Sequence, residues 1–269
     1  MSRPKLGQHW LADKHVLRQT AEAIKPSPDE TCIEIGGGKG ALSRMIAPLF
    51  RRLIIYEIDS NWAAHLQKYG PGWGGNIQVR EMDALKIEWS RDKLGIEPDE
   101  PLVITGNLPY YLTSPLLLRI AYSMLDFRRA IFLIQREVAD RIAAKPKDTE
   151  YGRLTVSLGA FLESKKLFNV RPESFKPMPR VMSTLIQMTR HETPLLSEED
   201  TDLFEKTVQL AFHMRRKMLK NNLLAGFPDV GAKRIEEILS CMGIPLKARA
   251  QEVGIGDFVT LTRMLKTAE

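Results

Sequence analysis

The residues whose types and spacing best suit chemistry are Asn107-Leu108-Pro109-Tyr110-Tyr111, directly after the apolar run 102–106. This run is short and β-branched, which predicts a buried parallel strand that ends in a proline-stiffened loop. Ligands bind beyond the carboxyl ends of such strands. There the Asn107 side-chain oxygen and a carbonyl of Leu108 or Pro109 could accept hydrogen bonds from the exocyclic amine of a purine, while a tyrosine ring stacks on the base. An ordinary strand-to-helix turn would explain the same residues.

A glycine loop precedes this segment in the chain. Residues 31–35 predict a first strand, Gly36-Gly37-Gly38-Lys39-Gly40 follows at once, and residues 41–49 keep helical spacing. A strand, a glycine loop and a helix form a nucleotide-binding turn, in which the backbone approaches the ligand closely. Lys39 is followed by Gly40 rather than Ser or Thr, so the loop is not a Walker A motif.

Acidic residues follow the next two predicted strands, residues 53–56 and 77–80. Glu57 lies where a carboxylate would hold ribose hydroxyls, and Asp83 could accept from an adenine amine. Glu34, just before the loop, predicts a negative charge that suits a cationic ligand better than a pyrophosphate. The pocket therefore fits S-adenosylmethionine, an adenosine that carries a sulfonium, although the loose glycine pattern also allows a nicotinamide dinucleotide.

The remaining pattern predicts the fold and its division. Further strands are expected at 130–134, 167–170 and 181–188, with a helix that Ser114 caps and Pro115 begins. Seven strands interleaved with helices predict an α/β fold with a doubly wound, mostly parallel sheet. Residues 191–269 predict a small all-α domain, so the expected boundary falls between 190 and 191.

Two features outside the glycine loop could contact a nucleic acid. The first is Phe175, held by Pro177 and Pro179 in an extended loop, which could form a second wall for the base or simply pack in the core. The second is Arg215-Arg216-Lys217, which the spacing places on a helix running from 200 to 218, near the amides Asn221 and Asn222. Such a cluster is either a solvated face or a phosphate contact, and its amide neighbours and the acidic remainder of the domain favour a contact with a nucleic acid.

Composition limits the class of protein. The 269 residues are 43% hydrophobic and 27% charged, the values of a soluble protein with a sizeable core. The net charge of +6 lies in residues 1–190, where 28 Lys and Arg face 21 Asp and Glu, against 11 and 12 in the remainder. No apolar run approaches a membrane span, and no Cys or His spacing indicates a metal site. We therefore expect a cytoplasmic protein without a metal, and a monomer.

Several motifs together resemble one family, the rRNA adenine N6,N6-dimethyltransferases of the ribosome-assembly branch. The resemblance spans nearly the whole chain and rests on these blocks: Gly7-Gln8-His9-Trp10-Leu11, similar to GQNFL; residues 34–42, similar to EIGPGxGxL with Gly37 in place of proline; the Asn107 block, similar to NLPY; residues 151–156 and 175–179; Arg180-Val181-Met182-Ser183, which departs from KVDS at Met182; and residues 211–217 with 221–223, similar to AFxxRRK and NNL.

This resemblance implies a Rossmann-like class I methyltransferase that dimethylates two adjacent adenines near the 3′ end of small-subunit rRNA, on the RNA or on a pre-ribosomal particle. The implied S-adenosylmethionine-binding residues are His9, Leu11, Gly36, Gly38, Glu57, Asp83 and Asn107. The implied catalytic residues are Asn107, Pro109 and Tyr110, and the expected substrate contacts are Leu108, Phe175, Arg215, Arg216 and Lys217. Two alternatives stay open: an assembly factor whose binding to rRNA matters more than its chemistry, and a nicotinamide-dependent oxidoreductase.

Overall fold

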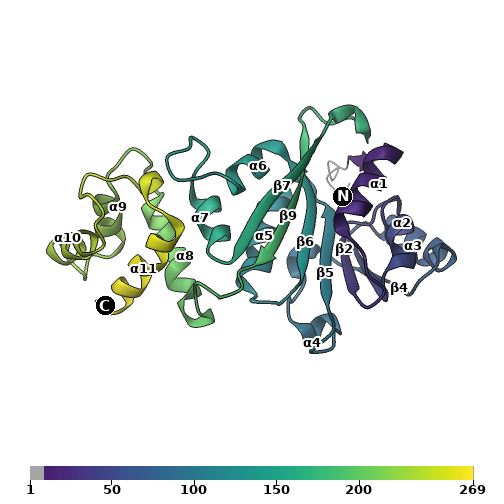
Figure 1. Cartoon of the computed structure of the whole chain (residues 1–269), viewed down its shortest axis with the longest axis horizontal. Helices are drawn as coiled ribbons and strands as arrows, with labels where there is room; N and C mark the ends of the chain where they lie inside the picture. The colour runs from purple at the N-terminus through teal and green to yellow at the C-terminus, as the bar shows by residue number, and fades with distance from the viewer. Residues whose placement is uncertain (1–8, 269) are drawn as a thin grey trace, which may run out of the picture. The chain divides into compact units, whose positions relative to one another are not determined.

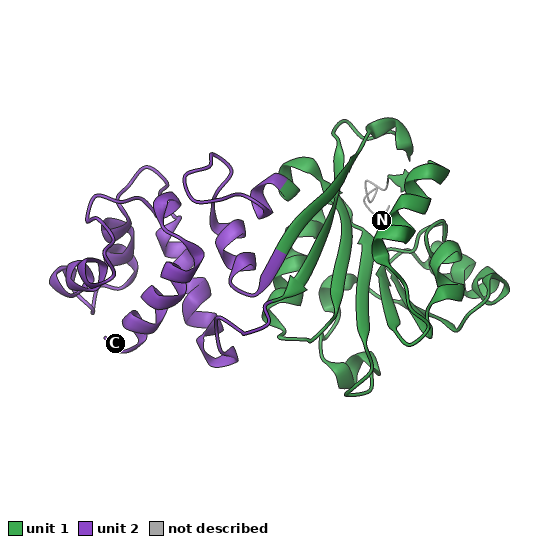
Figure 2. Cartoon of the chain, viewed as in Figure 1, with its two compact units in different colours: residues 1–139, 164–190 green, residues 140–163, 191–269 purple. Residues whose placement is uncertain are grey.

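The computed structural model describes residues 9–268, which form two compact units (Figures 1 and 2). The first unit comprises the described residues up to 139 together with 164–190. The second comprises 140–163 together with the chain from 191 onward. The chain passes from the first unit to the second after residue 190, which is where we expected the domain boundary. The segment 140–163, which we expected in the first domain, belongs instead to the second unit.

The first unit is built on a seven-stranded sheet in the order β4-β3-β2-β5-β6-β9-β7. Strands β2 to β6 pair in parallel, and β9 runs antiparallel to β6. All five residues of β2 are buried, as expected for a central strand. The prediction of a mostly parallel, doubly wound sheet is confirmed. The strands are β2 Thr31–Ile35, β3 Arg52–Glu57, β4 Ile77–Glu81, β5 Leu102–Asn107, β6 Arg129–Gln135, β7 Leu162–Val170 and β9 Ser183–Arg190.

Helices accompany these strands, and the parallel strands end at one edge of the sheet (Figure 1). The core beneath them is formed by apolar residues of β2 and β3 with residues of α1 and α3, including Ile24, Leu53, Ile55 and Leu66, all fully buried. The helices are α1 Lys14–Ile24, α2 Ser43–Ile46, α3 Ser60–Tyr69, α4 Arg91–Leu94, α5 Tyr110–Tyr122 and α6 Arg136–Ile142, and the 3-10 turns are η1 Ala47–Leu49, η2 Gly70–Trp73, η3 Ala84–Lys86 and η4 Pro172–Ser174.

The start of α5 differs from the prediction. Pro109 is the N-cap residue, and the helix begins at Tyr110 instead of at Pro115. The Pro109 carbonyl accepts from Leu112 N at 2.9 Å and from the Thr113 hydroxyl at 3.2 Å, so the first turn closes before Pro115 is reached. Pro115 thus lies inside the helix, where it donates no backbone bond. The block after β5 is therefore a helix N-terminus.

A two-stranded sheet that the sequence pattern did not reveal joins the start of the described chain to the loop before β9. Strand β1 Trp10–Leu11 pairs antiparallel with β8 Phe175–Lys176, which places Leu11 opposite Phe175. Ala12 N adds a bond to Ser174 O at 2.8 Å. Two residues per strand are too few to give a periodicity, so only the fold could bring these segments together.

The second unit is helical and has its own aromatic core. The side chains of Tyr151, Phe204 and Phe258 are fully buried there, and the Tyr151 hydroxyl donates to Val253 O at 2.8 Å. A Cβ at Gly159 would meet Ile255 Cδ1 at 2.5 Å, so the segment 140–163 packs tightly within this unit. Its elements are α7 Arg153–Gly159, η5 Glu198–Asp200, α8 Thr201–Ala211, α9 Leu219–Gly226, α10 Ala232–Cys241, η6 Ala250–Glu252 and α11 Ile255–Lys266.

The basic cluster does not lie on a helix as expected. Helix α8 ends at Ala211, and Arg215-Arg216-Lys217 lie in the turn before α9. The buried Asn222 side chain donates to Ala211 O at 2.8 Å and to Met214 O at 3.1 Å, and these bonds stabilise the turn. The sequence pattern could not show this, because the residues from 201 to 218 continue the helical spacing.

Candidate active site

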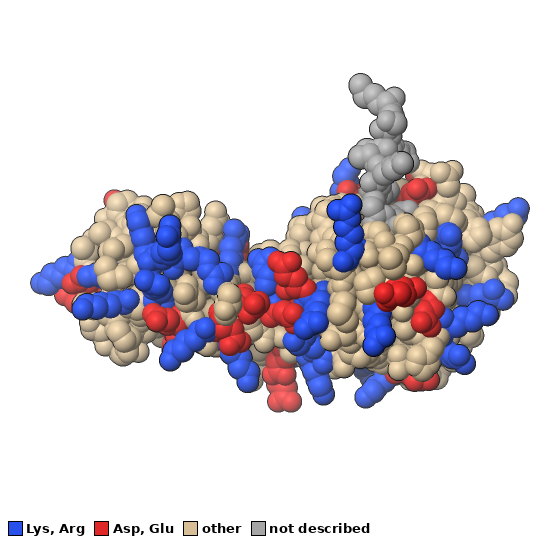
Figure 3. Space-filling model, turned by 90° about the horizontal axis from the view of Figure 1, so that it is seen from above, with Lys and Arg blue, Asp and Glu red and all other residues tan. Residues whose placement is uncertain are grey.

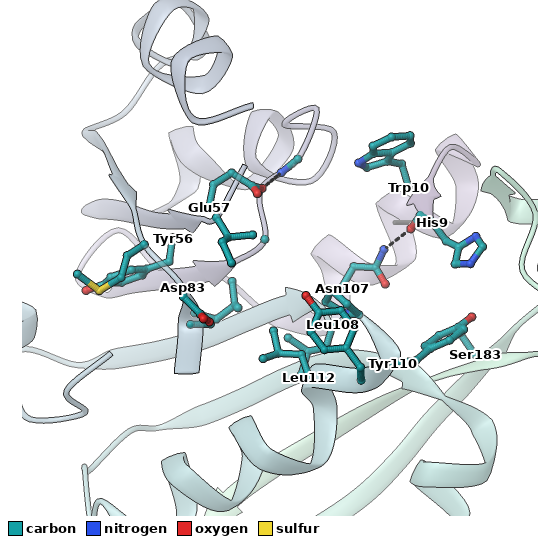
Figure 4. A pocket seen from close by; sticks show the side chains of 18 of the residues that line it. His9, Trp10, Tyr56, Glu57, Asp83, Asn107, Leu108, Tyr110, Leu112 and Ser183 are labelled. Atoms are coloured by element: carbon teal, nitrogen blue, oxygen red, sulfur yellow. Dashed lines mark hydrogen bonds between the residues drawn. The ribbon is translucent and has the colours of Figure 1, made fainter. Parts of the chain in front are cut away.

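A pocket opens in the first unit at the carboxyl edge of the sheet (Figure 4). Its walls come from the ends of β2, β3, β4 and β5, from β1, and from the segment 175–183. Ten of the residues predicted for the site line it: His9, Gly36, Gly38, Glu57, Asp83, Asn107, Leu108, Pro109, Tyr110 and Phe175. The other lining residues are Trp10, Ile35, Tyr56, Ile58, Met82, Ala84, Tyr111, Leu112 and Ser183.

The glycine loop is joined to the end of β3 by Glu57. Glu57 is 2% exposed, and its Oε2 accepts from Gly38 N at 2.8 Å while its Oε1 accepts from Asp59 N at 2.9 Å. Each carboxylate oxygen keeps a second lone pair for a hydroxyl donor. Gly38 has φ +51, and a Cβ there would lie 2.9 Å from Trp10 Nε1, so a side chain would strain the backbone and press on the Trp10 ring.

Asp83 occupies the corresponding place after β4. Its Oδ1 accepts from Leu85 N at 2.9 Å and caps η3, which leaves its Oδ2 for a second partner. The pKa of the nearby Tyr111 is raised, first by partial burial and then by the charges of Asp83 and Glu57. Two carboxylates of adjacent strands therefore act on one part of the pocket.

Asn107 is oriented by the main chain of His9. Its Nδ2 donates to the His9 carbonyl at 2.8 Å, and its Oδ1 accepts no hydrogen bond from residues 9–268 (Figure 4). Because the donor end of the amide is used, the acceptor end is the one available to a ligand. The Asn107 amide is thus anchored to the protein without losing the oxygen on which the prediction depended.

The two loop carbonyls that follow Asn107 differ. The Pro109 carbonyl is already used by Leu112 N and Thr113. By contrast, the Leu108 carbonyl has no donor in the described part of the chain, while its own N–H donates to Leu133 O at 3.0 Å. Of the two acceptors considered, Leu108 O is therefore the free one.

Aromatic rings form the other side of the pocket. The His9 ring stacks on Tyr110 at 5.7 Å between centroids, and His9 Nδ1 donates to Pro177 O at 2.8 Å. Burial raises the pKa of Tyr110, and the Ser183 hydroxyl partly opposes this effect. Tyr110 therefore stays neutral over the physiological range. Phe175 lines the pocket but is only 3% exposed and belongs to the hydrophobic core.

Two expectations about residues near the pocket need correction. Leu11 does not line the pocket, because its side chain packs in the core opposite Phe175. Glu34 is 3% exposed and also does not line the pocket. Burial raises the pKa of Glu34 to about 7, Ser43 lowers it, and the charge of Glu57 raises it. Glu34 therefore lies apart from the pocket and is only partly ionised near neutral pH, unlike the charged group that we expected beside a cationic ligand.

The basic cluster belongs to the second unit and is not part of this pocket. The Arg215 guanidinium donates to Thr149 O at 2.9 Å and to Tyr151 O at 3.0 Å, so it stabilises its own unit. Arg216 and Lys217 are exposed. Phosphate contacts are therefore better sought at these two side chains than at Arg215.

Trp10 and Ser183 are the pocket residues that sequence reasoning should have found. Trp10 lies within the block resembling GQNFL, and Ser183 ends the block resembling KVDS, so both were within motifs already noted. Tyr56, Ile58 and Met82 gave no comparable signal, since apolar residues beside strand ends are more often packing residues. Among residues 9–268, no group of three or more His, Cys, Asp or Glu is placed to hold a metal ion.

The sheet order, the glycine loop after β2, the carboxylates after β3 and β4 and the block after β5 define a Rossmann-like class I methyltransferase. Comparisons with known proteins make the assignment specific. The family model described as ribosomal RNA adenine dimethylase matches residues 1–267. The chain belongs to this family.

Its relatives and structural neighbours agree. It is similar to the ribosomal RNA small subunit methyltransferase A of Bordetella avium (strain 197N), with 36% identity covering 99% of this chain and 96% of the relative. The enzyme of the same name from Chlorobium chlorochromatii (strain CaD3) is 37% identical over 99% of this chain and 94% of its own length.

Two solved structures resemble the whole chain. A dimethyladenosine transferase from Plasmodium falciparum shares the fold, with a TM-score of 0.83 and 24% identity over 97% of this chain and 98% of that one. The 23S rRNA methyltransferase ErmE gives a TM-score of 0.68 and 27% identity over 96% of this chain and 99% of that one. These findings confirm the family resemblance and the methyltransferase class, and they disfavour a nicotinamide-dependent oxidoreductase.

Proposed function

We propose that this chain uses S-adenosylmethionine to dimethylate the N6 amines of two adjacent adenines near the 3′ end of small-subunit rRNA. The observation that carries this proposal is the pair of free acceptors, Asn107 Oδ1 and Leu108 O, beside two carboxylates in one pocket. Membership of the adenine dimethylase family supports the choice of reaction.

The pocket suits this cofactor. Glu57 would accept from the ribose hydroxyls and Asp83 from the adenine amine, and the glycine loop leaves room where a Cβ at Gly38 would intrude. S-adenosylmethionine supplies a methyl group activated by its sulfonium.

Asn107 Oδ1 and Leu108 O hold the target amine. An amine conjugated to a purine is a weak nucleophile, because its lone pair is delocalised into the ring. Two acceptors that bind its N–H groups favour the pyramidal form with a localised lone pair, and they hold it in line for displacement. The monomethylated amine keeps one N–H, so one acceptor is enough to orient it for the second transfer.

Tyr110 would hold the base itself. The partly buried ring of Tyr110 offers a stacking surface for an adenine turned out of its helix. The role of Pro109 is to fix the turn, since its carbonyl is used by the helix. The Phe175 ring forms part of the pocket wall from within the core.

We further propose that the first unit binds the cofactor and that the helical second unit contacts RNA through Arg216 and Lys217. Figure 3 shows Lys and Arg side chains over both units on the face drawn, with acidic side chains among them. The net charge of +6 favours a phosphate-bearing partner. The protein would work in the cytoplasm, as a monomer, on rRNA in an assembling small subunit. Among residues 9–268, no helix has the length and apolar character required to span a bilayer.

The experiment is to incubate the purified chain with labelled S-adenosylmethionine and with small subunits that lack this modification. The rRNA is then digested and the methylated nucleosides are mapped by mass spectrometry. We expect two adjacent N6,N6-dimethyladenosines near the 3′ end. Methylation at another base or position, or none at all, would overturn the proposal.

A further inference from the structure

An aromatic stripe on α3 is not explained by the core of the first unit. Helix α3 buries Ala63 and Leu66, which are at most 1% exposed. A second face of the helix carries Trp62, followed by His65 three positions later and Tyr69 seven positions later. Tyr69 is 48% exposed, and Trp62 and His65 are partly exposed. Rings of this size normally pack inside a protein or bind a partner.

These rings form a continuous row with Trp10. The centroids of Trp10 and Trp62 are 5.7 Å apart, those of Trp62 and His65 are 5.7 Å apart, and those of His65 and Tyr69 are 4.7 Å apart. The first two pairs meet edge to face, at 68° and 83°. In such a pair only one ring has a face covered, so the row keeps faces on which a base could stack.

Positive charge accompanies the row. Lys39 Nζ lies 4.5 Å from the centroid of Trp10 and 5.8 Å from that of Trp62, and Lys68 Nζ lies 5.2 Å from that of Tyr69. Neither lysine pairs with a carboxylate in the described part of the chain. Helix α3 contains no acidic residue, and the side chain of its N-cap, Asp59, accepts from Asn61 N.

Trp10 also lines the pocket, so the row begins where the substrate base would enter. We propose that the row Trp10, Trp62, His65 and Tyr69, with Lys39 and Lys68, binds single-stranded RNA that flanks the target adenines. This inference rests on the proposed function. Alternating rings and lysines match a strand whose bases stack on aromatic faces while its phosphates meet cations. An apolar protein partner would not require the lysines.

The test measures RNA binding separately from methylation. Fluorescent single-stranded 12-mer oligoadenylate and a duplex of the same length are titrated with the full chain at fixed salt. The variants are Tyr69→Ala, Trp62→Ala and Lys68→Ala. Gln67→Ala, an exposed residue of α3 outside the row, is the matched control.

We expect Tyr69→Ala and Trp62→Ala each to weaken binding of the single strand about tenfold, because stacking on one ring contributes roughly that factor. Lys68→Ala should reduce the salt dependence of binding. Binding of the duplex should change less, and Gln67→Ala should behave as the wild type. Circular dichroism and S-adenosylmethionine affinity of Tyr69→Ala should stay normal.

Unchanged affinity of folded Tyr69→Ala and Trp62→Ala for the single strand would overturn the inference. So would a loss of self-association in these variants without an effect on RNA binding, because the row would then bind a second copy of the chain. Failure of the proposed function looks different. In that case the wild type would not dimethylate rRNA, while the oligoadenylate titrations would still decide what the row binds.

Discussion

The orientation of Asn107 gives the sharpest prediction, because it depends on the main chain of His9 and not on the His9 side chain. Asn107→Ala removes one of two acceptors for the reacting amine. Removing one preorganised hydrogen-bonding partner from a reacting group typically lowers kcat by about 10²–10³-fold, or roughly 3–4 kcal/mol. His9→Ala keeps the carbonyl that lies 2.8 Å from Asn107 Nδ2, and loses the stacking on Tyr110 and the hydrogen bond from Nδ1 to Pro177 O. We expect kcat to fall less than tenfold in that variant.

Asn107→Asp distinguishes the anchor from the acceptor. The aspartate keeps an acceptor oxygen, but it places a second oxygen opposite the His9 carbonyl, where the amide N–H used to donate. Two acceptors cannot form a hydrogen bond, so the side chain should rotate away and the loss should equal or exceed that of Asn107→Ala.

Single-turnover methylation of undermethylated small subunits at saturating cofactor measures the chemical step. Separate titrations with S-adenosylmethionine and RNA show whether binding has changed. The reasoning is refuted if Asn107→Ala methylates at a near-normal rate. It is also refuted if folded His9→Ala, with normal cofactor binding, is as slow as Asn107→Ala, because the side chain of residue 9 would then be the essential part.

Further predictions concern stability and the second unit. The raised pKa of Glu34, about 7 against 4.5, means that the folded protein holds this proton more tightly, so wild-type stability should fall as pH rises from about 4.5 to 7. Glu34→Gln should remove this loss. In urea unfolding, the variant should be up to about 3 kcal/mol more stable than the wild type at pH 8 and similarly stable at pH 4. A stability profile of the variant that runs parallel to that of the wild type across this pH range would contradict the prediction. Gly37→Ala would place a Cβ 2.5 Å from Ile55 Cγ2 and should lower the free energy of unfolding by about 1–3 kcal/mol. The loss should be smaller when Ile55 is also replaced by Ala. An equal loss in both backgrounds would show that this contact is not the cause. Arg215→Ala should lower the free energy of unfolding by about 1 kcal/mol, because it loses hydrogen bonds to two backbone carbonyls. Arg216→Ala should instead weaken RNA binding and leave stability unchanged. The reverse pattern would contradict these assignments.

Much of the fold followed from local patterns. The buried strands 31–35 and 102–106 could be predicted because short apolar, β-branched runs bounded by Gly or Pro are typical of buried strands. The start of α5 could not, because Ser114-Pro115 is as good a helix start as Pro109-Tyr110 until the carbonyl of Pro109 is seen to be used. The end of α8 was missed for a similar reason. The helical spacing continues to Met218, whereas the turn after Ala211 is stabilised by side-chain bonds from Asn222 of the next helix, which local spacing does not reveal.

The sequence by itself determined the order of the strands along the chain, the glycine loop and the residue types at the strand ends, because these depend on neighbours in the chain. Tertiary structure alone decided that His9 orients Asn107, that Leu108 O is free, that Leu11 packs in the core and that Glu34 is buried away from the pocket. The positions of His9 and Leu11 depend on the pairing of β1 with β8, which joins residues more than 160 positions apart by backbone bonds that leave no pattern in the sequence. A motif therefore specifies which groups are available, and the long-range packing specifies which of them face the ligand.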